Sequence, residues 1–115
     1  MGLDVWKRAK DLAVNIYKIT EKGSISKDYC LKDQLRRSAV SIASNIAEGD
    51  ERETDKESIR FFYIARASSA EVLTQVIISH EAGYLEENIS ESLKAECIMI
   101  SKMLYRLIKA REKRG

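Results

Sequence analysis

Residues 35–49 combine a basic pair, a run of small side chains and an apolar face, and they end on a glycine. The apolar positions of this region recur at helical spacing, and they are Leu31, Leu35, Ile42 and Ile46. Ser38 or Ala39 fills the turn between them, so this face is narrow and can approach a neighbouring helix closely. Gly49 is expected to supply the left-handed position at which helices commonly stop. The segment therefore predicts a helix that packs tightly against another.

The composition favours a fold made only of helices. The chain has 115 residues and no proline, with 44% hydrophobic and 33% charged residues, and good helix formers dominate it. A chain of this length forms one domain by the usual prior and buries about 65% of its unfolded surface. We therefore expect a single all-α domain over residues 1–115.

Apolar periodicity divides the chain into four predicted helices, over about residues 3–22, 29–48, 55–82 and 89–113. Asp28 is a candidate N-cap for the second helix. Thr54 and Glu57 have the spacing of a capping box for the third, and residues 88–91 resemble a second box that opens the fourth. Four helices with short connections predict an antiparallel up-and-down four-helix bundle. The third is so apolar that we expect it to bury a second face against another chain.

No motif of the sequence predicts chemistry. Cys30 and Cys97 lack the partner histidines of a zinc site, the serines have no nucleophile elbow, and no glycine-rich loop could hold a phosphate. We therefore expect no catalytic residues, no metal and no cofactor, and a protein that is not an enzyme. A bundle places the two cysteines on opposed helices, so reduced thiols are expected. No apolar run approaches the ~18 residues of a membrane span, and we expect a cytoplasmic protein.

Basic residues give the candidate nucleic-acid contacts. Lys102, Arg106 and Lys109 share a helical face, and Lys113 extends it. The alternative is a solubilising face placed favourably at the negative end of a helix. Arg36 and Arg37 could also contact phosphates. Their alternative is an ion-pair network, with Arg37 level with Arg66 and Arg36 within reach of Glu71.

Four further polar residues are predicted to form a structural network. Arg66 lies between apolar positions of the third helix, where an unpaired charge is costly, and its candidate partners include Glu71 and Tyr105. Asn45 and Glu48 close the second helix. Glu48 is unfavourable at a helix C-terminus, so we expect it to have a specific partner.

The chain resembles the bacterial four-helix bundle proteins encoded within 23S rRNA intervening sequences, a ribosomal-protein-like family. The resemblance covers nearly the whole chain, and its parts are Val5-Trp6, residues 35–42 continued by 44–49, Ile64-Ala65-Arg66 and Gly83-Tyr84-Leu85. Ala43 stands where the family commonly has proline, which would bend a helix, so the second helix is expected to be straighter here.

The resemblance implies a homo-oligomer, characteristically a ring of five bundles. The related accessory variability determinant proteins of diversity-generating retroelements bind nucleic acid and a reverse transcriptase through basic ring surfaces. We therefore expect a non-enzymatic oligomer that binds RNA or DNA through basic surfaces, with a reverse transcriptase or another protein as a further partner. The alternative is a scaffold that organises a partner protein without nucleic acid.

Overall fold

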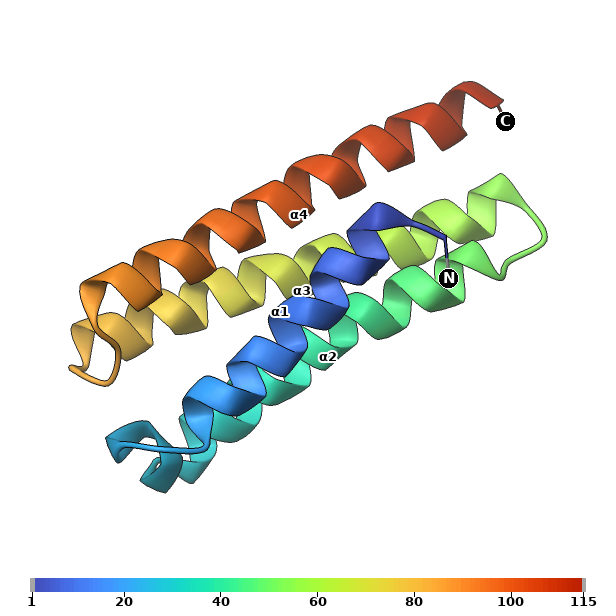
Figure 1. Ribbon diagram of the computed structural model, residues 1–115. Coiled ribbons are helices and arrows are strands. Elements are labelled where there is room, and N and C mark those ends of the chain that lie inside the picture. Colours follow the sequence, from blue (N-terminus) through green and yellow to red (C-terminus); the bar gives the residue numbers. More distant parts are fainter. Residues whose placement is uncertain (1, 115) are drawn as a thin grey trace.

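Four α-helices account for most of residues 2–114, which the computed structural model describes (Figure 1). They are α1 (Asp4–Thr20), α2 (Tyr29–Asp50), α3 (Asp55–Glu81) and α4 (Glu87–Arg114). A short 3-10 helix, η1 (Ser24–Lys27), lies between α1 and α2, where the sequence predicted only a surface connection. The predicted all-α fold is confirmed, and each helix begins and ends within two residues of its expected bounds.

Side-chain caps begin the second and third helices as predicted. Asp28 accepts a hydrogen bond from the backbone amide of Leu31 at 3.1 Å, and Thr54 accepts one from the amide of Glu57 at 3.2 Å. Each cap satisfies an amide that has no partner inside its helix. The Glu57 side chain makes no return bond to Thr54 within residues 2–114, so only one half of the predicted capping box forms.

The prediction for the start of α4 is wrong by two residues. The helix begins at Glu87, and the amide of Ser90 donates to the carbonyl of Glu86 at 3.0 Å. Asn88, the expected cap, therefore lies inside the first turn. An acidic residue early in a helix is favoured by the helix dipole, and Glu87 supplies it.

Gly49 does not end α2 by a left-handed turn, as the sequence had predicted. It is buried inside the helix, and within residues 2–114 only Gly23 and Gly83 have positive φ. A Cβ at Gly49 would lie 2.6 Å from Cε1 of Phe62 and 3.1 Å from the carbonyl oxygen of Ser58. The Ser58 hydroxyl also donates to the Gly49 carbonyl at 2.7 Å. The glycine is therefore required by the close approach of α2 and α3.

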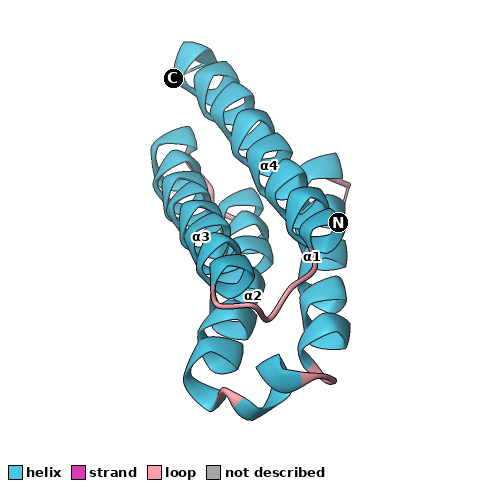
Figure 2. Ribbon diagram, turned by 90° about the vertical axis from the view of Figure 1, so that its left-hand side faces the viewer, coloured by secondary structure: helices cyan, strands magenta, loops and turns pink. Residues whose placement is uncertain are grey.

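The four helices form an antiparallel bundle in which each contacts its neighbours in sequence (Figures 1 and 2). The contact between α1 and α4, which closes the bundle, is smaller than the others. The molecule measures 47 × 20 × 20 Å along its principal axes. Its largest fully buried apolar side chains come from all four helices, and they are Phe62, Ile16, Leu35, Ile42, Ile46, Ile100, Leu104, Ile108, Val72 and Val76.

Polar pairs cross the interface between α2 and α3. The hydroxyls of Ser41 and Ser68 lie 2.9 Å apart, and Nε2 of Gln75 donates to Oγ of Ser38 at 3.2 Å. Ser38, Ser68 and Gln75 are buried. Because these groups hydrogen-bond across the interface, part of the cost of burying them is offset. The small side chains also let the two backbones approach, as the narrow face of α2 predicted.

One helix qualifies the expectation that no apolar run is long enough to span a membrane. By length and composition alone, α3 could cross a membrane, since an 18-residue window of it reaches a mean hydropathy of 1.2. Arg66 and Glu71 interrupt the apolar run of this helix. In the bundle α3 packs between α2 and α4, and its Phe62, Val72 and Val76 are completely buried. The apolar character of α3 is therefore partly explained by its place in the core.

Candidate nucleic-acid interface

Four cations share the solvent face of the second half of α4. They are spaced four, three and four residues apart, and they are Lys102, Arg106, Lys109 and Lys113. All four are exposed. At ~1.5 Å per residue the row extends about 17 Å along the helix. We call these four residues the α4 basic row.

A hollow of about 310 Å³ joins this row to α3 and is lined by Arg66, Lys102, Tyr105 and Arg106. Nε of Arg66 donates to Oγ of Ser101 at 3.1 Å, and its guanidinium carbon lies 5.2 Å from the centroid of the Tyr105 ring. Tyr105 is 47% exposed. The hollow thus holds three cations around an accessible aromatic ring, which is the combination that sites for single-stranded nucleic acid use.

The cations of the row differ in how far they are paired. Nζ of Lys109 lies 3.2 Å from the carboxylate of Glu112 and 5.3 Å from the centroid of the Tyr105 ring. The hydrogen bond to Glu112 and the charge of that carboxylate raise the pKa of Lys109 above its ordinary value. Lys102, Arg106 and Lys113 make no ion pair with any residue in the described range. They are the cations of the row with most capacity for a ligand.

The last arginines of α4 are used inside the bundle. The guanidinium of Arg111 lies 3.8 Å from Asp50 and 3.9 Å from Asp55, and Nη2 of Arg114 donates to Asp55 at 2.9 Å. The guanidinium carbon of Arg111 also lies 5.4 Å from the centroid of the Phe62 ring. These contacts fix the end of α4 beside the turn between α2 and α3. The two arginines therefore contribute less to an external basic surface than their sequence position suggests.

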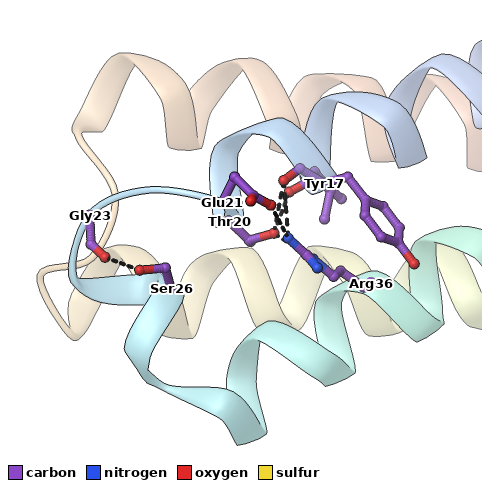
Figure 3. A network of polar contacts seen from close by, with 7 residues as sticks. Tyr17, Thr20, Glu21, Gly23, Ser26 and Arg36 are labelled. Atoms are coloured by element: carbon purple, nitrogen blue, oxygen red, sulfur yellow. Dashed lines mark hydrogen bonds and ion pairs between the residues drawn. The ribbon is translucent and has the colours of Figure 1, made fainter.

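Arg36 ties the start of α2 to the end of α1 (Figure 3). Its Nε donates to Oγ1 of Thr20 at 2.9 Å, and its Nη2 contacts both the Tyr17 carbonyl and the Glu21 carboxylate at 3.3 Å. The guanidinium carbon lies 4.4 Å from the centroid of the Tyr17 ring. Glu21 thus takes the place of the expected partner Glu71. These contacts favour the structural alternative for Arg36 over a phosphate contact.

Arg37, the next residue along α2, is exposed to solvent. With Asp33 and Tyr17 it lines an open hollow of about 580 Å³ on the outer side of α1 and α2. It makes no hydrogen bond or ion pair with the other residues that the structure describes, so the expected network with Arg66 does not form. Arg37 stays a candidate phosphate contact, on a different face from the α4 basic row.

The four residues predicted as one polar network lie in separate local contacts. Nδ2 of Asn45 donates to the carbonyl of Ser41 at 2.9 Å, and Glu48 pairs with Arg52 one turn later. Glu71 is exposed. Residues 66 and 71 are five positions apart, which is about 140° around a helix, so Arg66 meets α4 while Glu71 faces solvent.

The described residues were predicted to include no metal site, and their two cysteines were predicted to be reduced. Among residues 2–114, no group of three or more His, Cys, Asp or Glu side chains could hold a metal ion. Both cysteines are free, with Cys30 exposed and Cys97 buried. Burial raises the pKa of the Cys97 thiol to about 12, which leaves it protonated and unreactive near neutral pH.

The sequence predicts Tyr105 only as a partner for Arg66. The structure places it in the same hollow as two members of the α4 basic row. Its position, three residues after Lys102 and one before Arg106, was the available signal. The pairing of Arg111 with Asp50 and Asp55 had no such signal, because about 60 residues separate the partners.

The fold and this surface define a small antiparallel four-helix bundle with a basic row on its last helix. The chain belongs to the family of 23S rRNA-intervening sequence proteins, whose model matches residues 1–106. It is similar to the crystal structure of a protein of unknown function from the S23 ribosomal protein family of Bacteroides thetaiotaomicron VPI-5482. That match has 25% sequence identity and a TM-score of 0.84, and it covers 91% of this chain and 98% of the other. A comparison with curated proteins gives no significant match.

Proposed function

We propose that this protein binds RNA, or another nucleic acid, through the α4 basic row and the adjoining hollow, and that it acts without catalysis. The observation that carries the proposal is the gathering of Arg66, Lys102 and Arg106 around the exposed ring of Tyr105. The family has no established function, so the proposal depends on this surface.

The chemistry of the hollow suits a flexible, single-stranded segment. Arginine binds phosphate through two parallel hydrogen bonds, and lysine adds charge without a fixed direction. An exposed tyrosine can stack on any base, because every base has an aromatic face. Contacts of both kinds are largely independent of sequence. We therefore propose binding with weak sequence preference and strong dependence on salt.

Self-association is part of the proposal. One α4 basic row offers few phosphate contacts, and the whole chain carries a net charge of only +2. A ring of copies, such as the five that the family resemblance implies, would display the row several times, and the effective concentration of linked sites raises affinity steeply. We place this activity in the cytoplasm, where both thiols would stay reduced.

The test is a fluorescence-anisotropy titration of a structured RNA with single-stranded loops, at two salt concentrations. We expect the double variant Lys102→Ala/Arg106→Ala to bind at least tenfold more weakly than the wild type. The slope of log affinity against log salt concentration should become shallower by about two, because two phosphate contacts are removed. The matched control removes two exposed lysines far from the row, as Lys22→Ala/Lys27→Ala. Equal affinity of the two double variants, or no binding by the wild type, would overturn the proposal.

Exposed apolar side chains favour a second candidate, a scaffold for a partner protein. Ile98 and Met99 on α4 are 45% and 40% exposed, and Tyr63 on α3 is 46% exposed. Where such side chains form one contiguous patch, that patch often marks a protein contact. Affinity capture from cell extract with and without nuclease separates the candidates. A stoichiometric protein partner, such as a reverse transcriptase, that stays bound after nuclease treatment would favour the scaffold.

A further inference from the structure

Two exposed tyrosines lie on neighbouring helices, Tyr63 on α3 and Tyr105 on α4. They are 46% and 47% exposed. Tyr84 donates its hydroxyl to Asp28 at 3.0 Å, whereas the hydroxyls of Tyr63 and Tyr105 make no hydrogen bond within residues 2–114. Neither of these two rings is therefore held by a hydrogen bond of its own inside the described bundle, and both are open to a ligand.

Each of the two tyrosines is flanked by a pair of cations along its own helix. The residues are Arg60, Tyr63 and Arg66 on α3, and Lys102, Tyr105 and Lys109 on α4. Successive members lie three or four residues apart, so they are neighbours on the helix surface. Each helix thus presents a cation, an aromatic ring and a second cation in one line. We call these six residues the aromatic face.

Contacts between α3 and α4 bring the two lines of the aromatic face level with each other. Nε of Arg66 donates to Oγ of Ser101 at 3.1 Å, and the guanidinium carbon of Arg111 lies 5.4 Å from the centroid of the Phe62 ring. Because the two helices are antiparallel, Tyr63 lies beside the part of α4 between these two contacts, which contains the second tyrosine.

Two cations connect the rings across the helix boundary. The guanidinium carbon of Arg66, on α3, lies 5.2 Å from the centroid of the Tyr105 ring. Nζ of Lys109, on α4, lies 5.3 Å from the same centroid. The pKa of Lys109 is raised mainly by its hydrogen bond to Glu112 and the charge of that carboxylate, and further by Tyr105 and Tyr63. A residue of α4 is thus influenced by the tyrosine of α3, and the two rings share one surface.

The aromatic face carries a positive charge that attracts phosphate groups. Of its four cations, only Lys109 forms an ion pair within residues 2–114, with Glu112 at 3.2 Å. Phosphates of a single strand and of a duplex are both attracted, and the duplex carries the denser negative charge. The cations therefore give no preference for a single strand, and any such preference must come from the two rings.

A ring stacks on a base only where a face of that base is free. The bases of a duplex cover one another in the stack, whereas a single strand can turn its bases outward onto aromatic side chains. The two rings project from different helices, and the axes of packed helices lie about 8–10 Å apart. They are therefore placed to take two different bases of one strand.

We propose that Tyr63 and Tyr105 each stack on one unpaired base of the same strand, while Arg66 and Lys102 bind the phosphates between those bases. The inference deepens the proposed function and rests on it, since it names the ligand as a single strand with at least two bases free of pairing. The strand crosses from α3 to α4 and does not follow the α4 basic row alone. Tyr63 and Arg60, which lie outside that row, thereby become part of the site.

Substitutions of the two tyrosines test the stacking by fluorescence anisotropy. The probe is a labelled oligouridylate of about 12 nucleotides, within the site sizes of single-strand binding proteins. We expect Tyr63→Leu and Tyr105→Leu each to bind it at least about fivefold more weakly than the wild type. The slope of log affinity against log salt concentration should stay unchanged, because no phosphate contact is lost. Tyr63→Phe and Tyr105→Phe keep the aromatic face and should bind within about twofold of the wild type.

Tyr29→Leu is the matched control for these variants. Tyr29 is 70% exposed and has Lys32 at 5.1 Å from its ring, so it is also an accessible tyrosine beside a cation. It lies at the start of α2, at the end of the bundle opposite to the start of α3 (Figure 1). We expect this variant to bind the oligouridylate as the wild type does. Circular dichroism checks that every variant is helical.

A strand without bases tests the stacking directly. The wild type should bind an abasic strand of the same length at least about fivefold more weakly than the oligouridylate, because no base is left to stack. Tyr63→Leu and Tyr105→Leu should bind the abasic strand as tightly as the wild type does. A change in folding or in assembly would weaken the binding of both probes alike, so this comparison isolates the contact between ring and base.

An RNA duplex of the same length separates this inference from the proposed function. We expect the wild type to bind the single strand more tightly than the duplex at equal salt, although the duplex carries the denser charge. Tighter or equal binding of the duplex, or leucine variants that bind the oligouridylate as tightly as the wild type, would overturn the inference. The proposed function would still stand if Lys102→Ala/Arg106→Ala weakened binding in the same assay. No binding of any probe by the wild type would overturn both.

Discussion

At the scale of single residues, two adjacent arginines have different roles. Successive helix positions point about 100° apart, so Arg36 reaches α1 while Arg37 faces solvent. Arg36 donates to Thr20, which is 1% exposed, and to the Tyr17 carbonyl at the end of α1. Its ion pair with Glu21 adds little, because the Glu21 side chain is 71% exposed. The hydrogen bonds to Thr20 and to the Tyr17 carbonyl are therefore the main contribution of Arg36 to stability.

We expect Arg36→Ala to lower the free energy of unfolding by about 1–3 kcal/mol, since it removes charge-assisted hydrogen bonds and the packing on Tyr17. Arg37→Ala should change it by less than about 0.5 kcal/mol, because the lost side chain is exposed and has no polar partner among residues 2–114. Urea unfolding followed by circular dichroism measures both. Equal effects of the two substitutions would show that the Arg36 contacts do not stabilise the fold.

The two thiols should differ in reactivity. At pH 8 we expect Cys30 to react with a disulfide reagent at an ordinary rate, and Cys97 to react only after unfolding, because burial raises its pKa to about 12. An unfolded thiol ionises near its ordinary value, so this group favours the unfolded state as the pH rises above about 9. A Cys30→Ser variant should have no rapidly reacting thiol. Rapid labelling of that variant would show that Cys97 is accessible.

At the scale of helices, close approach decides how α2 meets α3. Gly49 and Ser58 bring the two backbones together at one end, and small polar pairs continue the contact along the helices. The helix boundaries themselves depend on local signals, which is why the caps at Asp28 and Thr54 were predictable. The contact between two helices depends on which residues of the second helix face the first. Local sequence patterns do not show which residues these are.

Gly49→Ala should destabilise the protein, although alanine is the better helix former. The new Cβ would lie 2.6 Å from the Phe62 ring and 3.1 Å from a backbone oxygen. Overpacking costs about 1–3 kcal/mol, against a gain of about 1 kcal/mol in helix propensity. We expect the free energy of unfolding to fall by up to about 2 kcal/mol. Urea unfolding measures this as a lower midpoint concentration. Gly2→Ala is the control, because a Cβ at Gly2 would meet no atom of the other described residues within 4 Å. A more stable Gly49→Ala variant would mean that Phe62 moves aside without cost.

At the scale of the whole molecule, the helices are not equally held. Both α2 and α3 have extensive contacts, whereas α1 packs mainly on α2. Its contact with α4 is small, and it includes the exposed pair of Arg8 and Glu96 at 2.9 Å. Exposed ion pairs of this kind contribute little to stability. The bundle is therefore expected to open first along the contact between α1 and α4.

Hydrogen exchange tests this expectation. We expect backbone amides of α1 to exchange faster than those in the middle of α3, because local opening requires less free energy where fewer buried contacts are lost. Mass spectrometry of peptides from residues 4–20 and 55–81 measures the difference. If residues 4–20 exchange as slowly as residues 55–81, the bundle opens only as one unit.

The sequence by itself determined the helices, their order and their starts at Asp28 and Thr54, because apolar spacing and capping act over a few neighbouring residues. It also identified the family and the residues of the α4 basic row. Only the tertiary structure decided that Gly49 serves a helix contact, that Arg36 pairs with Glu21 instead of Glu71, and that Tyr105 joins the basic hollow. These outcomes depend on which helix lies opposite and at what angle. That arrangement is set by packing between residues far apart in the chain.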